Sequence, residues 1–334
     1  MGRVVKKLAV IILNWNGLEL LKRFLPTALR YTQGEEVDLI VADNGSTDES
    51  VSWMRSTFPE LRIIEFPENY GFAEGYNKAI SLTDYPYTIL LNSDVEVTEG
   101  WWQPLLKFME THPEVGAVQP KIKSYNQKDY FEYAGAAGGY LDKNGYPYCR
   151  GRLFDIVEKD EGQYDGEATE ICWASGAALA VKTSLYLSLG GLDPRFFAHM
   201  EEIDLCCRML AAGFKIYAIS DSEVFHVGGA SLRQGNPKKT YLNFRNNLLL
   251  LYKNLPRKGK RKKLIVRRLL DTLAFLMFLV KLDFRNAGAV VKAHRDYSKM
   301  LKHYKDIKEV PEDFSFPGSD RNIIFDRYIL RKKR

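Results

Sequence analysis

Short apolar runs alternate with amphipathic stretches along most of the chain, and this alternation predicts the fold. Uninterrupted runs rich in Val, Ile and Leu are typical of strands buried on both faces of a sheet. Strands are predicted at 8–13, 37–42, 61–66, 89–91, 115–119, 176–181 and 215–218, and helices at 18–31, 72–82, 101–111, 183–189 and 201–212. Strands that alternate with helices of about ten residues imply βαβ units. We therefore expect an α/β fold with a Rossmann-like, mostly parallel central sheet flanked by helices.

Polar side chains collect where three of the predicted strands end. These are Asn14 and Asn16 after the first strand, Asp43, Asn44 and Ser46 after the second, and Asn92, Ser93 and Asp94 after the fourth. Open α/β sheets bind ligands at the carboxyl ends of their strands, so we expect a ligand cleft at this edge. Oxygen donors such as those at 92–94 suit a hard divalent cation that carries phosphates. Ser46 or Thr47 is also expected to cap the helix that follows.

The first strand is not followed by a GxGxxG motif, which argues against dinucleotide binding in the Rossmann manner. A second acidic cluster, 201–204 (EEID), is expected to open a helix, where the macrodipole alone favours acidic residues. Between the two halves, residues 121–170 are rich in Gly, Tyr and charge, and we interpret them as a long irregular loop. Specificity is expected to lie largely in this segment.

The composition is that of an ordinary globular protein: 46% of the 334 residues are apolar and the net charge is +6. The four cysteines show no paired-CxxC spacing, so neither a zinc module nor a disulfide framework is indicated, and a reduced, cytoplasmic setting fits. The apolar run 8–13 follows a basic start but is short and lacks a small-residue cleavage site. We interpret it as the first strand and not as a signal peptide.

Composition changes after residue 255, and we predict a catalytic domain at 1–255 and a basic, helical C-terminal region at 256–334. Eight of the twelve residues 257–268 are Lys or Arg, and a strongly apolar stretch, 269–280, follows. That stretch is too short to span a bilayer. We expect 257–280 to contact the inner face of the cell membrane peripherally, the alternative being a helix packed on the catalytic domain. No recognition motif supports nucleic-acid binding. A further polar helix is expected at 289–304, followed by a loosely ordered tail from 310.

Five motifs occur in an order that resembles the family-2 glycosyltransferases, nucleotide-sugar-dependent inverting enzymes of the GT-A fold, and within them the rhamnosyltransferase-like branch. They are DNGSTD (43–48), NYGFAEGYN (69–77), LLNSDVEV (90–97), GGLDPRFFAHMEEIDLCCR (190–208) and FHVGGAS (225–231). The resemblance covers roughly residues 6–250. It implies transfer of a hexose, such as rhamnose, from a nucleoside-diphosphate-sugar to a glycan or lipid-linked oligosaccharide acceptor in surface-polysaccharide biosynthesis.

The resemblance also implies roles for residues at the strand ends. Asp43 matches the family's nucleotide-binding aspartate, and the donor-binding set carried over with it is Asn14, Asn16, Asn44, Ser46, Asn69, Gly71, Asn77, Asn92 and Arg245. Helix packing is an equal interpretation of the 69–77 segment, and surface pairing is an equal interpretation of Arg245. Asp94 matches the last aspartate of the family's DxD motif, which binds Mn²⁺ or Mg²⁺, and His226 matches a histidine that completes this site. Because Asn92 replaces the first aspartate, strict metal dependence is left open.

Glu202 matches the family's general base, whose carboxylate removes the proton from the acceptor hydroxyl. The family pattern is Glu-Asp, whereas this chain has Glu201-Glu202, so Glu201 and Asp204 are kept as alternative bases. Trp173 resembles an aromatic residue on the acceptor side, although core packing explains it better.

Two other functions are weighed against this one. A catalytically silent protein that only binds nucleotide-sugars is favoured by Asn92 and disfavoured by the presence of Asp94, Glu202 and His226. A nucleotidyltransferase is disfavoured because residues 14–17 (NWNG) are not a Gly-rich, basic phosphate loop.

Overall fold

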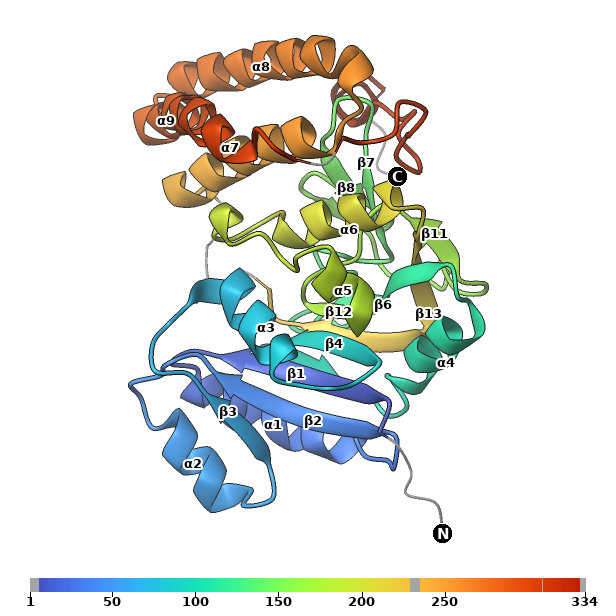
Figure 1. Cartoon of the computed structure of the whole chain (residues 1–334). Coiled ribbons are helices and arrows are strands. Elements are labelled where there is room, and N and C mark those ends of the chain that lie inside the picture. Colours follow the sequence, from blue (N-terminus) through green and yellow to red (C-terminus); the bar gives the residue numbers. More distant parts are fainter. Residues whose placement is uncertain (1–5, 229–234, 308, 331–334) are drawn as a thin grey trace.

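The computed structural model describes residues 6–228, 235–307 and 309–330. A large sheet forms the centre of the molecule, with helices on both faces and a layer of three long helices on one side (Figure 1). The strands of the large sheet are β1 (Leu8–Asn14), β2 (Val37–Asp43), β3 (Arg62–Glu65), β4 (Tyr87–Asn92), β5 (Val95–Val97), β6 (Val115–Ser124), β11 (Thr169–Ile171), β12 (Ala178–Lys182) and β13 (Lys215–His226). The helices are α1 (Leu18–Tyr31), α2 (Ser50–Thr57), α3 (Gly71–Ser81), α4 (Gln103–Thr111), α5 (Thr183–Ser188), α6 (Glu201–Ala211), α7 (Pro237–Asn254), α8 (Arg257–Val280) and α9 (Phe284–Met300).

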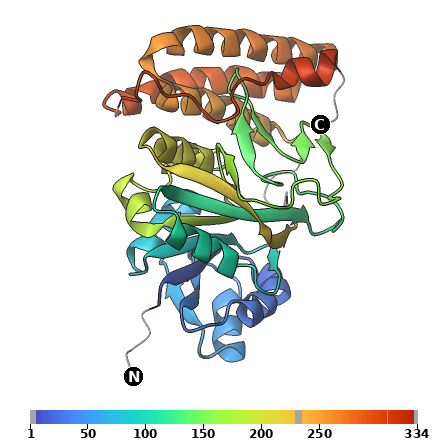
Figure 2. The same ribbon diagram turned by 90° about the vertical axis from the view of Figure 1, so that its right-hand side faces the viewer.

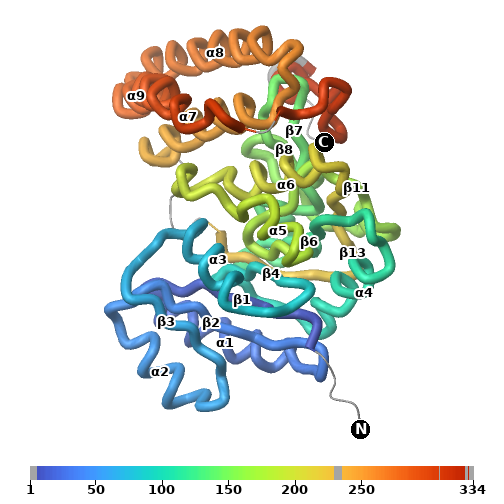
Figure 3. The backbone as a smooth tube through the Cα atoms, viewed as in Figure 1, coloured from blue at the N-terminus to red at the C-terminus, as the bar shows by residue number. Residues whose placement is uncertain are grey.

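The large sheet has the strand order β11-β13-β6-β12-β4-β1-β2-β3, with β5 paired to β13. Strands β4, β1, β2 and β3 pair in parallel with one another, and β12 is inserted antiparallel between β4 and β6. The tube drawing follows this path from the N-terminal strands to the C-terminal helices (Figure 3). The predicted fold class, an α/β fold with a mostly parallel central sheet, is confirmed.

The apolar runs form strands because both faces of the sheet are covered. Along β1, Ala9 and Ile11 pack into one buried cluster, and Leu8, Val10 and Ile12 pack into the cluster on the other face. A strand that alternates between two cores has no solvent-facing side, which is why its sequence is continuously apolar. The parallel pairing also aligns the strand ends, since Asn14 lies opposite Asp43 in the β1–β2 register.

The expectation of an irregular loop at 121–170 is only partly right, because short strands interrupt it. Strand β6 continues to Ser124, and a small antiparallel sheet follows, built from β7 (Gly139–Leu141), β8 (Pro147–Cys149), β9 (Arg152–Leu153) and β10 (Ile156–Val157). Strands of two or three residues are too short to show a period-two pattern, which explains why the sequence did not indicate them. Gly139 lies directly on the Trp173 ring, where a Cβ atom would be 2.1 Å from the ring, so only glycine fits there. Trp173 is buried and donates its indole N–H to the Tyr140 carbonyl (3.0 Å), as core packing predicts.

The C-terminal helices α7, α8 and α9 pack on one another as a layer against the rest of the molecule (Figure 2). The predicted loose tail from residue 310 is wrong for the described part, because Ile323 is buried and its N–H donates to Asp142 Oδ2 (3.3 Å). The boundary at residue 255 stays a prediction. Helix α7, which precedes it, makes extensive contacts with α9, which follows it. Of the helices in the described residues, none combines the length and apolar character needed to cross a bilayer.

Candidate active site

The ends of β1 and β2 form one hydrogen-bonded cluster. Asn14 Nδ2 donates to Asp43 Oδ2 (2.9 Å) and to Ser46 Oγ (3.2 Å), and the Ser46 N–H donates to Asp43 Oδ1 (2.9 Å). Asp43 and Asn14 are buried. The sequence predicted that these three residues would meet, and the structure brings them together. A buried, oriented carboxylate at this edge is suited to accepting a hydrogen bond from an N–H of a nucleotide base.

The next loop is tied to this cluster by side-chain amides. Asn16 Oδ1 accepts a hydrogen bond from the Thr47 N–H (2.7 Å), and the Asn16 N–H donates to Ser46 Oγ (2.9 Å). Ser46 and Thr47 therefore bind the first loop and do not cap α2, so that expectation is wrong. The N-cap position of α2 is Glu49, which makes no side-chain cap hydrogen bond, and Oδ1 of Asp48, just before it, accepts from the Ser50 N–H (3.0 Å).

Asn44 and Asn69 hold the turn that enters α3. Asn44 Nδ2 donates to Asn69 Oδ1 (3.0 Å) and to the Gly71 carbonyl (3.0 Å), and Asn44 Oδ1 accepts from the Tyr70 N–H (3.0 Å). Asn69 Oδ1 also accepts from the Gly71 N–H (2.7 Å). Gly71 has a φ of 77°, a left-handed value that glycine adopts without strain. These residues shape the cleft by placing its backbone.

Asn77, which the resemblance includes in the donor-binding set, and Gly75 of the same helix both make packing contacts. Asn77 Nδ2 donates to the Leu192 carbonyl (2.8 Å), and its Oδ1 accepts from the Tyr186 hydroxyl (2.6 Å) and the Leu192 N–H (2.9 Å). Both ends of the amide are thus occupied by the 186–192 segment. Gly75 packs against Asn44 and Leu13, each 3.0 Å from the position of a Cβ atom. Helix packing, the alternative interpretation, explains both residues.

Asp94 and His226 meet although they lie far apart in the sequence. Strand β5 pairs with the end of β13, which places His226 opposite Val95. His226 Nε2 donates to Asp94 Oδ1 (3.1 Å), and the Val227 N–H donates to the Asp94 carbonyl (3.1 Å). The two residues predicted to share a metal site are therefore neighbours. The last residues of the FHVGGAS motif, 229–231, lie outside the described residues.

Glu132 completes this cluster and was not identified from the sequence. Its carboxylate lies 3.6 Å from His226 Nδ1, on the side of the ring opposite Asp94, and it is buried. Burial alone would lower the pKa of His226, but the hydrogen-bonding carboxylates of Asp94 and Glu132 outweigh burial and raise the pKa to about 10. No local signal marks Glu132, because its segment forms no regular strand and its partner lies on β13.

The chemistry of this cluster fits a divalent cation in part. Asp94 Oδ1 and His226 Nε2 lie 3.1 Å apart and would offer one carboxylate oxygen and, once Nε2 has lost its proton, one imidazole nitrogen as ligands. Within the described residues, no set of three His, Cys, Asp or Glu side chains is arranged as a complete metal site. Mg²⁺ commonly takes one or two protein ligands and completes its shell with substrate phosphates and water. The residues present suit a cation that arrives with a diphosphate.

Glu202 is the second residue of α6 and lies near the end of β4. The Cβ and Cγ atoms of Glu202 both lie 3.7 Å from the position that a Cβ atom on Gly176 would occupy. The next residue, Ala177, accepts a hydrogen bond at its carbonyl from the N–H of Asn92, the last residue of β4 (3.0 Å). This places Glu202 close to the end of β4. Burial raises the pKa of Glu202 to about 7, although the backbone N–H groups at the helix start oppose the shift. A carboxylate with such a pKa is suited to general-base catalysis near neutral pH.

Glu201 points into the protein. It is buried, and its Oε2 has no hydrogen-bond partner among the described residues. Burial and the neighbouring Glu202 carboxylate raise its pKa well above the ordinary value. Glu202 is partly accessible, so of these two carboxylates it is the one placed to reach an acceptor hydroxyl.

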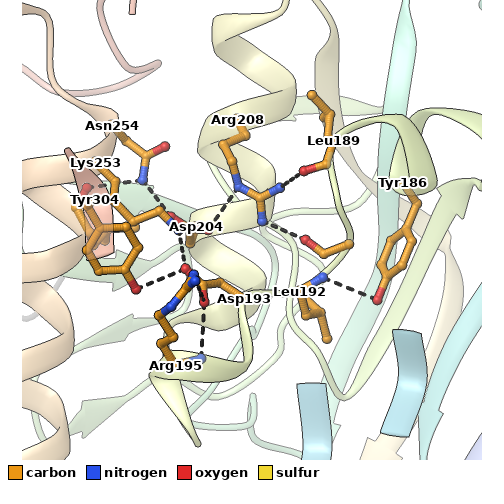
Figure 4. A network of polar contacts seen from close by, with 12 residues as sticks. Tyr186, Leu189, Leu192, Asp193, Arg195, Asp204, Arg208, Lys253, Asn254 and Tyr304 are labelled. Carbon is orange, nitrogen blue, oxygen red and sulfur yellow. Dashed lines mark hydrogen bonds and ion pairs between the residues drawn. The ribbon is translucent and has the colours of Figure 1, made fainter. Parts of the chain in front are cut away.

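Asp204 is not the base, contrary to one of the alternatives left open by the sequence. It is fully buried, with Oδ2 accepting from Arg208 Nε (2.9 Å) and Lys253 Nζ (2.9 Å), and Oδ1 accepting from Asn254 Nδ2 (2.8 Å) (Figure 4). Burial would raise its pKa, but the Arg208 and Lys253 cations hold the pKa below its ordinary value. Its place in the network shows that it anchors α6 to α7.

Arg245 lies in the same region but does not reach toward a diphosphate, so its predicted donor-binding role has no support. Its Nη2 donates to the Phe196 carbonyl (2.7 Å) and its Nε donates to Asn246 Oδ1 (2.9 Å). Asn246 Nδ2 donates to the carbonyls of Phe196, Ala198 and His199 at 3.0, 2.8 and 2.7 Å. Phe197, His199 and Met200 all have positive φ, at 70°, 68° and 75°. Residues 245 and 246 thus hold a strained loop that leads directly into Glu201 and Glu202.

Comparisons with known proteins show what this chain is similar to in sequence and in fold. Residues 9–160 match the model of glycosyl transferase family 2. The chain is 25% identical over 233 residues to N-acetylglucosaminyl-diphospho-decaprenol L-rhamnosyltransferase of Mycobacterium tuberculosis, covering 66% of this chain and 75% of that protein. It is 22% identical over 249 residues to the low-salt glycan biosynthesis hexosyltransferase Agl10 of Haloferax volcanii, covering 72% and 74%.

Solved structures show the same fold. The structure of GalNAc-T7 with UDP, GalNAc and Mn²⁺ matches with a TM-score of 0.58 at 15% identity. The match covers 75% of this chain and 48% of the GalNAc-T7 chain. The mannosyltransferase PcManGT of Pyrobaculum calidifontis, in complex with GDP-Man and Mn²⁺, matches with a TM-score of 0.53 at 14% identity, over 90% of this chain and 88% of that one. The family match and these folds lead to one conclusion: residues 9–160 are similar to glycosyl transferase family 2, and the chain has the GT-A fold.

Proposed function

We propose that the protein transfers a hexose, such as rhamnose, from a nucleoside-diphosphate-sugar to a glycan or lipid-linked oligosaccharide acceptor with inversion at the anomeric carbon. The carrying observation is Glu202, a partly accessible carboxylate with a pKa of about 7 beside the end of β4. The setting we propose is surface-polysaccharide assembly at the cytoplasmic face of the cell membrane. The rhamnosyltransferase and hexosyltransferase relatives support the substrate class.

In this proposal the strand ends bind the donor. Asp43, oriented by Asn14 and the Ser46 N–H, accepts a hydrogen bond from the base, and Asn44 and Asn69 fix the backbone of the neighbouring turn. Asp94 and His226 are directed at the diphosphate. A divalent cation bound there would supply positive charge that stabilises the departing nucleoside diphosphate. Glu132 holds the His226 ring from behind.

The transfer is a single displacement. The Glu202 carboxylate removes the proton from the acceptor hydroxyl, whose oxygen forms a bond to the anomeric carbon on the face opposite the leaving group. The bond from the anomeric carbon to the diphosphate oxygen breaks, and its electron pair leaves with the nucleoside diphosphate. The loop held by Arg245 and Asn246 keeps Glu202 in position.

The second candidate function is a catalytically silent protein that binds nucleotide-sugars, which the substitution of Asn92 for an acidic residue favours. Thermal unfolding with UDP, dTDP or GDP, each with and without Mn²⁺, separates the two. A ligand present at a hundred times its dissociation constant adds about 2.7 kcal/mol to the free energy of unfolding, enough for a shift of a few degrees. The test variant is Asp94→Ala, and Asp84→Ala, an exposed aspartate, is the matched control.

A Mn²⁺-dependent shift with one nucleotide that is lost in Asp94→Ala and kept in Asp84→Ala would support the donor site and name the nucleotide. If no nucleotide shifts the midpoint, the proposed donor site is wrong. A shift that does not depend on Mn²⁺ would show that Asn92 has changed the chemistry of the site. Nucleotide binding without any transfer to glycan or lipid-linked acceptors would favour the silent protein.

A further inference from the structure

Helix α8 turns its apolar residues toward solvent. Seven exposed side chains lie on its outer face: Ile265, Val266, Leu269, Leu273, Leu276, Met277 and Val280. At 3.6 residues per turn they fall within an arc of roughly 120°. Leu273 is 61% exposed and Val280 is 84% exposed. In Figure 1, α8 is the outermost element of the helical layer, so this face is not covered by another part of the described chain.

The inner face of α8 combines both kinds of residue: Leu264, Phe275 and Phe278 are half-buried there, beside a buried polar pair. Arg267 and Asp271 are buried and form an ion pair (3.0 Å), Arg267 Nε donates to Asn247 Oδ1 (2.7 Å), and His294 Nε2 donates to Asp271 Oδ2 (3.0 Å). The Arg267 guanidinium also lies 3.8 Å from the centre of the Tyr146 ring. An ordinary surface helix of a water-soluble protein directs its apolar face inward. Helix α8 differs in that it also exposes an apolar arc on its outer side, and its buried polar contacts help to hold that orientation.

The apolar surface continues past the end of the helix. Leu282, in the turn that leads to α9, is 73% exposed, and Phe284, the first residue of α9, is 64% exposed. Leu282 has a φ of 58°, a left-handed value at which glycine or asparagine is usual. A large apolar side chain at a strained, exposed turn has no role in packing the described chain.

Basic residues flank this face. Arg257, Arg261, Lys262 and Arg268 are exposed at the N-terminal half of α8, and Lys281 and Arg285 are exposed at the other end. The positive charge of these residues indicates which kind of partner covers the apolar face. A second copy of this chain would bring cationic rims together, whereas a surface of anionic lipid headgroups would neutralise them.

We propose that the outer face of α8, from Ile265 to Val280, lies in the plane of an anionic lipid bilayer, with its leucines in the headgroup–acyl boundary and its Lys and Arg residues on the headgroups. The arrangement of a large apolar face beside cationic residues is that of an interfacial helix. The inference deepens the proposed function, since a lipid-linked acceptor would lie in the same surface, but it does not depend on nucleotide binding. Of the two interpretations of 257–280 given by the sequence, it favours peripheral membrane contact over a helix that only packs on the catalytic domain.

The test is flotation of the full chain with vesicles of phosphatidylcholine alone or with about one third phosphatidylglycerol. We expect binding to the anionic vesicles that weakens as salt is raised. The variant Leu273→Glu/Val280→Glu should lower the bound fraction at least about tenfold, because both charges would enter the apolar boundary. The matched control is Leu82→Glu/Leu187→Glu, which adds the same charges at exposed leucines of the catalytic part.

Equal binding by the two double variants, or no binding by the unchanged chain, would overturn the inference. Loss of a dimer in sedimentation, without any vesicle binding, would assign the face to a second copy and also overturn it. The nucleotide-induced thermal shift, measured on the same variants, reports whether the catalytic part is folded. Vesicle binding without a nucleotide shift would contradict only the proposed function. A nucleotide shift without vesicle binding would contradict only this inference.

Discussion

Nδ1 of His226 lies 3.6 Å from the Glu132 carboxylate, while its Nε2 lies 3.1 Å from Asp94. The ring is therefore held between two buried carboxylates from distant parts of the chain. One carboxylate belongs to the proposed diphosphate site, and the other orients the ring from behind, as outer carboxylates do for histidines that bind metals.

We expect Glu132→Gln to weaken Mn²⁺-dependent nucleotide binding about 10- to 100-fold, because the ring loses the carboxylate that orients it. Binding is measured by titrating nucleotide in the thermal-unfolding assay at fixed Mn²⁺. The matched control is Glu167→Gln, the same change at an exposed glutamate on the same segment. Equal affinity of the two variants would show that Glu132 does not position His226.

Glu202→Gln should lower the turnover number at least about a hundredfold, the usual contribution of a general base, and leave nucleotide affinity unchanged. The amide keeps the size of the side chain but cannot accept the proton. The turnover number is measured from initial rates of donor consumption at a saturating concentration of acceptor. Asp204→Asn tests the rejected alternative: it should lower thermal stability through the loss of its ion pairs with Arg208 and Lys253. Near-normal turnover in Glu202→Gln would rule out the assignment of the base.

The rate should rise with pH through a value near 7. The pKa of Glu202 is raised to about 7 by burial, so the carboxyl is mostly protonated below this pH and cannot accept the acceptor proton. Above it the carboxylate form dominates and the rate reaches a plateau. The measurement is kcat/KM between pH 5.5 and 8.5 in the unchanged chain. A profile that falls with rising pH across this range would be incompatible with Glu202 acting as the base.

Lys253→Met should destabilise the protein by about 3–5 kcal/mol, because it removes the buried cation that Asp193 and Asp204 share. Lys253 Nζ donates to Asp193 Oδ2 (2.7 Å) and to Asp204 Oδ2 (2.9 Å), and all three residues are buried. The control is Lys22→Met, which removes an exposed ion pair with Glu19 on α1 and should change the free energy of unfolding by less than about 1 kcal/mol. Denaturant unfolding compares the two, and equal effects would mean that α6 and α7 are held together by packing alone.

Much of the site was accessible from the sequence because it depends on local patterns. The apolar runs of β1, β2 and β4 predicted buried strands, and a general property of parallel sheets then placed Asn14, Asp43 and Asp94 at one edge. Glu201 and Glu202 were expected at the start of a helix, and α6 begins at Glu201. These features need only the period of the pattern and the residues that interrupt it.

The tertiary structure decided what depends on contacts between distant segments. It paired Glu132 with His226, assigned Asp204 to Lys253 and Arg208, and committed Arg245 to the loop before α6. A titratable residue has the same letter in the sequence whether its partner is a ligand or a buried cation, so its role cannot be inferred until the fold supplies that partner. The direction of α8 was decided in the same way, because the buried pair of Arg267 and Asp271 helps to hold the apolar arc of this helix on its outer side.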